Sequence, residues 1–378
     1  MMYTLLLLFG FLAVLGLLIL STLFLYGYYK NHNKDPPDFH PNVCVIVPCK
    51  GKEQNLEQNL EALCTQHYSN YTVIFVVDSE HDAAYPSVSR IVQKFKNSRI
   101  EFSTKLEGCS GKISALLTGI KKAGDVAVYV FADSDVCPHK EWLSNLVAYL
   151  YDENIGAATG FRWYFPHSWT SSLISTWNMA PMSALFYPSL NYAWGGSTAI
   201  RTSLFKKLDI ESKWRAGFSD DLMLTKAVKN AGYRIKFVPQ CIVESPSEVH
   251  LLRFLHWGSQ QLTWVKWYTP FFWLFYFAGI VFLQCLTIFG FLLVGMGVTI
   301  PGLLMVSALF FEMIYGLVGI LVLKRLMGYP KEKFRFVWRY ALLMPVVFFL
   351  FAYNALASSV KQQIVWGGRT YRKRDAVR

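Results

Sequence analysis

Hydrophobic and polar positions are distributed differently in three successive parts of the chain. Residues 3–29 form one uncharged apolar run, residues 41–247 alternate short apolar runs with polar segments, and residues 267–311 are again free of charge. A helix of about 20 apolar residues crosses the hydrocarbon core of a bilayer. We therefore predict a transmembrane anchor in residues 1–29. A cleaved signal peptide is the alternative, but the run is too long and has neither a basic start nor a small-residue cleavage site.

The middle part has the rhythm of an α/β fold. Apolar residues recur at helical spacing at Leu56, Leu60 and Leu63, between runs that have the length of buried strands. Those runs are residues 43–47, 72–77, 127–131 and 234–238. Because strands that alternate with helices favour a parallel sheet, residues 41–247 are predicted to form a parallel-rich α/β domain.

One stretch inside that domain has a different composition. Residues 163–200 contain no Asp, Glu, Lys or Arg, are rich in Trp, Met and Ser, and are interrupted by Pro166, Pro181 and Pro188. An interfacial helix and a buried helix of the α/β domain both explain this composition, and periodicity does not separate the two interpretations.

The C-terminal part predicts several membrane helices. We expect an interfacial helix at residues 248–268, followed by a membrane region at residues 269–360 with spans near 269–293 and 302–323. Glu312 falls inside the second span. Since a carboxylate in lipid is costly, Glu312 is expected to face protein or a cavity.

The last apolar segment, residues 336–357, contains Pro345 and precedes a basic tail at residues 361–378. Basic residues favour the cytoplasmic flanks of membrane helices. Three complete C-terminal spans would place this tail outside if the α/β domain lies in the cytosol. A re-entrant or interfacial final helix would keep it inside, and this interpretation is favoured.

Composition and charge support a membrane protein. Hydrophobic residues make up 53% of the chain and charged residues only 16%, against about 25% charged residues in soluble domains. The net charge of +12 fits nucleic acid, an anionic membrane surface or a polyanionic substrate. Basic residues cluster beside the apolar runs, so the membrane is favoured and no nucleic-acid partner is predicted. The seven Cys include no Cys-x-x-Cys pair, and neither a zinc site nor a disulfide framework is indicated.

Acidic side chains follow two of the predicted strands. Asp133 and Asp135 come directly after residues 127–131, and Asp78 comes directly after residues 72–77. Ligands of open α/β sheets bind at the carboxyl ends of the strands, and carboxylates there can hold a divalent metal against a diphosphate. Each acid alone is also explained as a turn or capping residue. Two such strand ends in one domain favour a binding site.

A second acidic pair, Asp220 and Asp221, precedes the helical pattern of residues 222–231. Helix N-termini attract carboxylates, so capping is a structural explanation. Two neighbouring acids can also have different roles, in which one caps the helix and the other is a general base with a raised pKa. Both explanations stay open.

Two glycine-containing segments have the composition of ligand-binding turns. Residues 108–112 open a predicted helix, where backbone N–H groups and Lys112 could receive a diphosphate, although the spacing is not that of a Walker motif. Residues 195–198 (GGST) permit close approach of the backbone to a ligand, and a plain glycine turn explains them almost as well.

Taken together, these residues resemble glycosyltransferase family 2, and most closely its ceramide glucosyltransferase-like membrane branch, family 21. The resemblance covers nearly the whole chain and rests on the order of its motifs. These are residues 45–51 (VIVPCKG), 55–56 (NL), 59–61 (NLE), Asp78, Lys112, Asp133 with Asp135, Gly196-Ser197 with Arg201, and Asp220-Asp221.

The resemblance implies a glycosyltransferase-A, Rossmann-like α/β fold and a role for each matched residue. Donor-binding residues would be Lys50, Asp78, Lys112 and Asp133. Asp133 and Asp135 would hold Mg²⁺ or Mn²⁺, and Asp221 would be the catalytic base. The acceptor site or the rim of the active site would be formed by Gly196, Ser197, Asp220, Gln260, Trp264 and Lys266.

The chain departs from the family pattern in one motif. Residues 260–264 (QQLTW) match the family's Q/R-x-x-R-W, but Thr263 stands where the family has Arg. The missing guanidinium would help to organise the diphosphate or the acceptor, and Lys266 is a candidate to replace it. Residues 365–372 (VWGGRTYR) resemble the W-R-x-G/R-x-Y ending of the same enzymes, which implies a tail at the cytosolic rim of the active site. A solvated basic tail on an anionic membrane surface is the alternative.

The resemblance therefore predicts a membrane-embedded, inverting glycosyltransferase whose catalytic domain faces the cytosol. It would transfer glucose or another hexose from a UDP-sugar to a lipid acceptor such as ceramide. A processive polysaccharide synthase is the first alternative, against which stand the small number of apolar segments and Thr263. A non-catalytic membrane scaffold or transporter subunit, suggested by Thr263 and Glu312, is the alternative from another class. No oligomeric state is predicted.

Overall fold

The computed structural model describes residues 2–31, 37–165, 168–245, 250–327 and 329–373, and the chain divides into two compact units. We call them the sheet unit and the helical unit. The sheet unit comprises Asn33–Tyr164, Tyr187–Ser247 and Gln362–Arg378. The helical unit comprises Met1–His32, Phe165–Phe186 and Glu248–Lys361.

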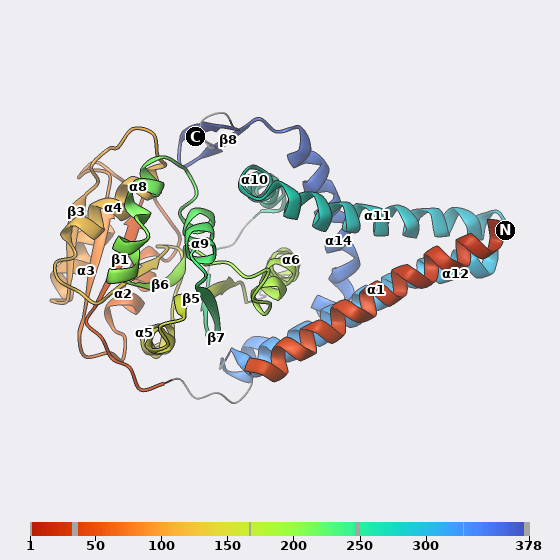
Figure 1. The fold of residues 1–378 in the computed structure, drawn as a ribbon, viewed down its shortest axis with the longest axis horizontal. Helices are drawn as coiled ribbons and strands as arrows, with labels where there is room; N and C mark the ends of the chain where they lie inside the picture. The colour runs from red at the N-terminus through yellow and green to blue at the C-terminus, as the bar shows by residue number, and fades with distance from the viewer. Residues whose placement is uncertain (1, 32–36, 166–167, 246–249, 328, 374–378) are drawn as a thin grey trace. The chain divides into compact units, whose positions relative to one another are not determined.

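The sheet unit is built on a sheet that has, within the described residues, seven strands in the order β3-β2-β1-β4-β6-β5-β7 (Figure 1). They are β1 (Val43–Cys49), β2 (Tyr71–Val77), β3 (Ser98–Phe102), β4 (Val128–Ala132), β5 (Ile155–Trp163), β6 (Ser197–Arg201) and β7 (Arg234–Glu244). Strands β1 to β4 run parallel, β6 is antiparallel to both neighbours, and β5 is parallel to β7. The carboxyl ends of β1, β2, β4 and β5 therefore share one edge, which we call the carboxyl edge.

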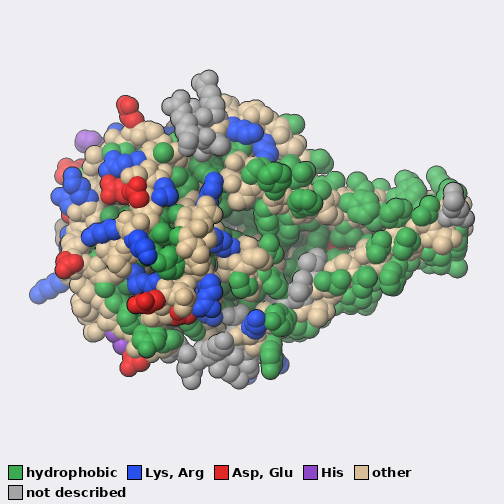
Figure 2. Space-filling model, in the orientation of Figure 1, with side chains coloured by type: hydrophobic (Ala, Val, Ile, Leu, Met, Phe, Trp, Pro, Cys, Tyr) green, Lys and Arg blue, Asp and Glu red, His purple; other side chains and the backbone are tan. Residues whose placement is uncertain are grey.

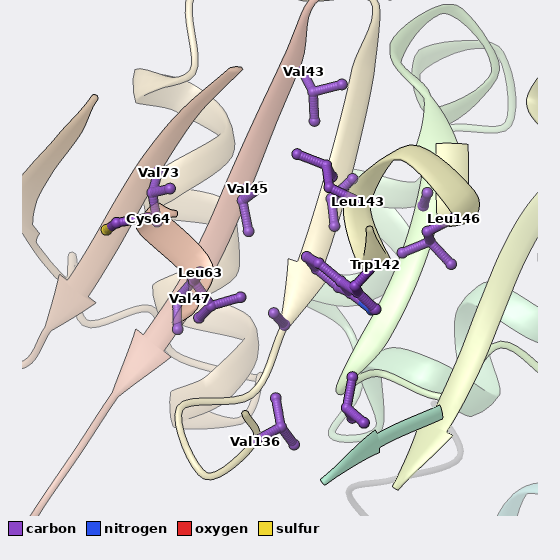
Figure 3. Packing of buried hydrophobic residues seen from close by; sticks show 14 of the residues in the cluster. Val43, Val45, Val47, Leu63, Cys64, Val73, Val136, Trp142, Leu143 and Leu146 are labelled. Atoms are coloured by element: carbon purple, nitrogen blue, oxygen red, sulfur yellow. The ribbon is translucent and has the colours of Figure 1, made fainter. Parts of the chain in front are cut away.

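Strand β1 is buried on both faces, which explains its continuous apolar sequence. Because successive side chains alternate between the two faces, Val43, Val45 and Val47 belong to one core cluster, whereas Cys44 and Ile46 belong to the other. Figure 3 shows the three valines on the face that also carries the fully buried indole of α5.

Helices from different parts of the chain cover the two faces of the sheet. The first core cluster includes residues of α2 (Leu56–Cys64), α3 (Tyr85–Lys94) and α5 (Trp142–Ala148). The second includes residues of α4 (Gly111–Lys122), α7 (Thr202–Lys207), α8 (Ile210–Arg215) and α9 (Asp220–Asn230). Both faces are thus dry, and ligands have access to the sheet only at its edges.

The predicted parallel-rich α/β sheet is confirmed, and its four predicted strands are β1, β2, β4 and β7. The sequence patterns missed β3, β5 and β6. Strand β3 pairs on one side only and carries Arg99 and Glu101, while β5 is interrupted by Gly156 and Gly160. These strands lack a long apolar run, so their pairing partners rather than their own sequence define them.

The helical unit joins helices from distant parts of the chain. They are α1 (Met2–Asn31), α6 (Trp169–Leu185), α10 (Leu251–Tyr268), α11 (Pro270–Gly295), α12 (Thr299–Val306), α13 (Ala308–Leu326) and α14 (Val337–Val360). Within the described residues, four segments are long and apolar enough to cross a membrane: α1, α11, α12 with α13, and α14. Figure 2 shows hydrophobic side chains along the visible surface of α1, α11 and α12. Such surfaces are compatible with lipid rather than water.

Helix α6, which lies in the uncharged stretch, packs on other helices of the helical unit. Its Trp177 ring stacks on Phe351 of α14 with ring centroids 4.8 Å apart, and lies 5.2 Å from the ring of Trp257 on α10. Residues 165–186 therefore belong to the helical unit, although the sequence analysis placed them in the α/β domain. The expected helix at 248–268 corresponds to α10 of this unit within the described residues, and its interfacial position stays a prediction.

Glu312 has a polar partner inside the helical unit. Its Oε1 accepts a hydrogen bond from Gln284 Nε2 of α11 at 2.7 Å, and both side chains are buried. The expectation that this carboxyl group faces protein rather than lipid is confirmed.

Most of the described residues after α14 form a hairpin. Strands β8 (Gln363–Trp366) and β9 (Arg369–Arg372) are antiparallel, and Gly367 and Gly368 turn between them with positive φ angles of 56° and 75°. The ring of Tyr371 lies 4.9 Å from that of Phe218. The hairpin is thus part of the sheet unit.

Candidate active site

The carboxyl edge collects most of the charged residues that the sequence singled out. Lys50 follows β1, Asp78 follows β2, and Asp133 and Asp135 follow β4. Lys50 Nζ lies 2.9 Å from Asp78 Oδ2. The edge therefore presents an ion pair on β1 and β2 beside a pair of acids on β4.

Lys112 connects two of the acidic sites. It lies in the first turn of α4, whose N-cap Ser110 accepts a hydrogen bond from the Ile113 amide at 3.2 Å. Lys112 Nζ lies 2.8 Å from Asp133 Oδ1 and 3.1 Å from Asp220 Oδ2. Burial alone would lower the pKa of Lys112, but the two carboxylates outweigh burial and raise it above its ordinary value. The side chain therefore stays charged.

Arg162 near the end of β5, which the sequence analysis did not single out, binds both acids of the β4 pair. Its Nη2 donates to Asp133 Oδ2 at 2.9 Å and to Asp135 Oδ1 at 3.0 Å, and its Nη1 donates to Asp135 Oδ2 at 2.9 Å. Nη1 also donates to Tyr164 Oη at 3.2 Å, and the guanidinium carbon lies 5.0 Å from the centre of the Trp194 ring. The Arg162 side chain is only 12% exposed. These are partly buried, charge-assisted hydrogen bonds that fix the two acids side by side.

The electrostatic balance keeps Asp133 ionised. Burial would raise the pKa of its carboxyl group, yet Lys112 and Arg162 outweigh burial and lower the pKa below its ordinary value. Asp133 is thus a fixed negative charge between two fixed positive charges.

Two glycines allow the chain to pass next to these charged groups. A Cβ atom on Gly195 would lie 2.3 Å from Asp220 Oδ2, and one on Gly196 would lie 2.6 Å from Asp133 Oδ2 and 2.3 Å from the Trp194 ring. Non-bonded atoms do not approach so closely, so the arrangement requires glycine at both positions. The backbone at Gly195 and Gly196 therefore approaches the carboxylates of Asp220 and Asp133 closely.

The acid pair at the start of α9 has two different environments. Burial raises the pKa of Asp220 to about 6, an effect that Lys112 opposes and Asp221 reinforces. Asp221 is less buried, and its Oδ1 accepts hydrogen bonds from the Ser219 hydroxyl at 2.5 Å and from the Leu222 amide at 2.7 Å. Its Oδ2 makes no hydrogen bond to any side chain or amide that the structure describes. The Asp220 carboxylate therefore binds Lys112, while Oδ2 of Asp221 is available to bind another group.

Glu53, in the loop after β1, is a second group that the sequence analysis did not identify. Its Oε2 accepts a hydrogen bond from Ser134 Oγ at 3.0 Å. Ser134 is the residue between Asp133 and Asp135 in the sequence. Burial raises the pKa of Glu53 to about 7, and the charge of Asp135 adds to the effect. The sequence offers only one indication of a role for Glu53, which is its position three residues after Lys50.

The order of these residues along the chain agrees with a known protein family. The sequence profile of Glycosyl transferase family 21 matches residues 8–377, which is nearly the whole chain. The chain belongs to glycosyltransferase family 21. The predicted family is confirmed, and the mixed α/β sheet agrees with the glycosyltransferase-A fold class predicted with it.

This family-21 chain is similar to known proteins over part of their length. It is 32% identical to ceramide glucosyltransferase 1 of Caenorhabditis elegans over 125 residues, which cover 30% of this chain and 27% of that protein. It is 24% identical to the probable glycosyltransferase YdaM of Bacillus subtilis over 281 residues, which cover 68% of this chain and 62% of that protein. Each alignment spans less than two thirds of the relative.

Two solved structures show a limited overall likeness to the family-21 chain. The mannosyltransferase PcManGT of Pyrobaculum calidifontis, in complex with GDP-Man and Mn²⁺, has a TM-score of 0.47 and 19% identity and covers 68% of this chain and 73% of its own. GalNAc-T7 with UDP, GalNAc and Mn²⁺ has a TM-score of 0.42 and 14% identity and covers 56% of this chain and 45% of its own.

Other predicted site residues of the family-21 protein have different surroundings. Ser197 is completely buried, and its Oγ accepts a hydrogen bond from Trp142 Nε1 at 2.8 Å, so its side chain stabilises the core. Gln260 and Trp264 lie on α10 of the helical unit, where the Trp264 and Trp267 rings are 5.3 Å apart. A role for Gln260 and Trp264 at the rim of the active site stays a prediction.

Lys266 of α10 binds carbonyl groups at the end of α14. Its ammonium group donates to the carbonyl oxygens of Ser358, of Ser359 at 2.9 Å and of Lys361 at 3.1 Å. The last carbonyl groups of a helix carry partial negative charge, and a lysine there acts as a cap. This arrangement does not support the expectation that Lys266 replaces the guanidinium missing at Thr263, which is itself completely buried.

The pair on β4 has the chemistry of a divalent-metal site. Carboxylate oxygens are ligands that Mg²⁺ and Mn²⁺ prefer. Apart from Glu53, the site around the pair combines four acids with two cations: Asp133, Asp135, Asp220 and Asp221, with Lys112 and Arg162. Their formal charge of −2 is what one divalent ion neutralises. Within the described ranges, no group of three His, Cys, Asp or Glu side chains is placed to hold an ion, and both carboxylates of the pair are bound by Arg162.

Proposed function

We propose that this protein is an inverting glycosyltransferase that transfers a sugar from a UDP-sugar to a lipid acceptor. The observation that carries the proposal is Lys112, held at the N-terminus of α4 between Asp133 and Asp220 at the carboxyl edge. A fixed positive charge and the free amides of a helix start are suited to a diphosphate. They lie at the edge where ligands of open α/β sheets bind, and membership of family 21 supports glycosyl transfer.

The donor contacts follow from the order of the strands. Asp78, paired with Lys50 at the ends of β2 and β1, is assigned to the nucleoside, and Lys112 is assigned to the diphosphate. Asp133 and Asp135 would hold Mg²⁺ or Mn²⁺. When bound there, the ion neutralises charge on the diphosphate leaving group.

Asp221 is assigned as the general base because its Oδ2 is not engaged by a described partner, whereas Asp220 is bound to Lys112. In the proposed step, the acceptor hydroxyl oxygen attacks the anomeric carbon and its proton passes to Asp221. The bond between the anomeric carbon and the diphosphate oxygen breaks on the opposite face, so the configuration inverts. Lys112 stabilises the negative charge that develops on the leaving oxygen.

The membrane helices support a lipid as the acceptor. The 125-residue similarity to a ceramide glucosyltransferase makes ceramide the first acceptor and glucose the first sugar to test. Basic residues in the last turn of α13 and just after it, among them Lys324, Arg325 and Lys331, favour a cytosolic position for the connection between α13 and α14. We infer that the sheet unit faces the cytosol as well.

The test uses the purified full chain in mixed micelles that contain ceramide. UDP-glucose, UDP-galactose and UDP-N-acetylglucosamine are added separately, and lipids are analysed by mass spectrometry. A glycolipid formed by the wild type and absent with Asp221→Asn is the expected result. Arg234→Gln, which removes an exposed ion pair with Asp152, is the matched control and should retain activity.

Two other results would replace the proposal. A polymer of sugar in place of a glycolipid would identify a polysaccharide synthase. Absence of transfer to any lipid or sugar, together with transport that Asp221→Asn leaves intact, would identify a non-catalytic membrane protein.

A further inference from the structure

Arg162 fills the position between Asp133 and Asp135 that a divalent ion would take. Together with Lys112 it binds all four carboxylate oxygens of the two acids, at distances from 2.8 to 3.0 Å. An ion that takes the position between the two acids must displace the guanidinium, and an ion on the remaining lone pairs of these oxygens meets its positive charge. The protein's own cations and a divalent ion therefore compete for one pair of ligands.

Release of Arg162 is unfavourable unless a new partner is present. The side chain is 12% exposed, and Tyr164 and Trp194 hold the guanidinium by contacts that do not involve the acids. A buried guanidinium without a carboxylate would keep an uncompensated charge. The oxygen atoms of a diphosphate match the planar guanidinium donors and are suited to replace the carboxylates.

We propose that Arg162 is a positioning residue that couples metal binding to donor binding, an inference that rests on the proposed function. In the absence of donor, Arg162 holds Asp133 and Asp135 and keeps a divalent ion from binding tightly. When a nucleoside diphosphate is present, the guanidinium binds it and releases the acids. By linkage, each of the two ligands then raises the affinity for the other by the same factor.

The experiment measures Mn²⁺ binding to the full-length protein in detergent by electron paramagnetic resonance of the free ion, with and without UDP. For the wild type, UDP should lower the Mn²⁺ dissociation constant about 10-fold or more, within the usual range of coupling between two sites. Arg162→Gln removes the competing charge. It should bind Mn²⁺ alone about 10-fold more tightly than the wild type and show less than about 3-fold coupling to UDP.

Two further variants keep the test decisive. Arg234→Gln removes an exposed Arg–Asp pair at the start of β7 and should show wild-type coupling. Arg162→Lys keeps the charge but cannot bind both acids in a fork, so its coupling should be intermediate. If Arg162→Gln does not fold, as judged by gel filtration and tryptophan fluorescence, Arg162→Lys carries the test.

Unchanged Mn²⁺ affinity and unchanged coupling in the Arg162 variants would overturn the inference and leave the proposed function intact. A wild type that binds neither Mn²⁺ nor UDP would overturn both. The binding measurement does not depend on turnover, and the two failures are therefore distinguishable.

A second, independent observation concerns how often the chain crosses the membrane. The chain leaves the sheet unit after Ser247 and re-enters it at Gln362, and hairpin β8–β9 packs there through Tyr371 and Phe218. A chain that leaves one side of a bilayer and returns to the same side crosses it an even number of times. Between these points, α11, the pair α12–α13 and α14 are each long enough to cross. One of the three therefore does not cross.

The distribution of basic residues indicates which of the three segments does not cross the membrane. The link between α11 and α12, residues 296–298, is uncharged, whereas Lys324 and Arg325 lie in the last turn of α13 and Lys331 lies in the connection to α14. Basic connections favour the cytosolic side. The geometry points to α11 and α12–α13 as the crossing pair and to α14 as a helix along the membrane surface. Since α14 is one continuous helix of 24 residues, it cannot enter the bilayer and return within itself. Figure 1 shows α14 running across the direction of α11 within the helical unit.

Cysteine labelling of oriented membrane vesicles tests this topology without reference to activity. In a Cys285→Ala background, Lys96→Cys reports the side of the sheet unit and Met296→Cys, at a position 75% exposed, reports the link between α11 and α12. An impermeant maleimide should label Lys96→Cys and a C-terminal cysteine tag from one side and Met296→Cys from the other. A tag that reacts from the same side as Met296→Cys overturns the inference.

Discussion

Glu53 gives the sheet unit a pH dependence whose sign follows from its surroundings. Burial raises the pKa of its carboxyl group from 4.5 to about 7, with a further contribution from Asp135 and an opposing one from the Ser134 hydrogen bond. In the unfolded chain the pKa returns to its ordinary value. Between these two pKa values the folded protein binds more protons than the unfolded chain. The stabilising contribution is therefore complete below the unfolded pKa and is lost as the pH rises through about 7.

The size of the effect can be worked out from the same shift. One pKa unit corresponds to about 1.4 kcal/mol, so the rise of the Glu53 pKa from 4.5 to about 7 corresponds to at most about 3 kcal/mol. Because the carboxyl group is partly exposed to water, screening reduces the expected change in the free energy of unfolding to about 2 kcal/mol. For a unit of this size, that change corresponds to roughly 5 °C in Tm.

Glu53→Gln removes the titration and keeps the shape of the side chain. Thermal unfolding of the full chain in detergent with EDTA, followed by tryptophan fluorescence at pH 5 and pH 8, should show the wild type losing roughly 5 °C relative to Glu53→Gln at the higher pH. Glu80→Gln, at an exposed position, is the matched control and should follow the wild type. A difference between wild type and Glu53→Gln that is constant with pH, or of opposite sign, would refute the burial argument.

Three further substitutions test the site. Gly196→Ala should lower kcat/KM about 100-fold, because its Cβ atom would displace Asp133 by a clash at 2.6 Å; steady-state kinetics and a crystal or cryo-EM structure would show both effects. Asp221→Asn should lower kcat about 100-fold to 10,000-fold with UDP affinity preserved, as measured by product formation and calorimetry. Lys112→Met should weaken UDP binding about 10-fold or more, measured by the same calorimetry, since it leaves Asp133 and Asp220 to repel the diphosphate.

Residues whose position depends on the local chain were predictable from the sequence. Asp78 and Asp133 follow apolar runs, and parallel strands bring the carboxyl ends of such runs to one edge. The start of α4 was predictable for the same reason, because Ser110 and Gly111 are ordinary signals of a helix N-terminus. The order of these elements along the chain was enough to indicate the family.

Residues whose role depends on pairing between distant strands were not predictable in this way. Arg162 is a lone basic residue beside an uncharged stretch, and its position next to Asp133 follows from β6 inserting between β4 and β5. For Lys266, a local sequence pattern suggested a role that its distant contacts do not support. Its spacing from Thr263 suggested a substitute for the missing arginine, but the end of α14, almost 100 residues later, provides its partners.

The charge balance at the carboxyl edge bears on the proposed donor site. Apart from Glu53, four acids stand against Lys112 and Arg162, and their formal charge of −2 would repel a diphosphate until further positive charge arrives. In the proposed mechanism, a divalent ion on Asp133 and Asp135 would cancel that charge, and the displaced Arg162 would become available to the phosphate oxygens. On this argument, loss of Arg162 should affect donor binding more when Mn²⁺ is present than when it is absent, which is the opposite of what a purely structural arginine would do.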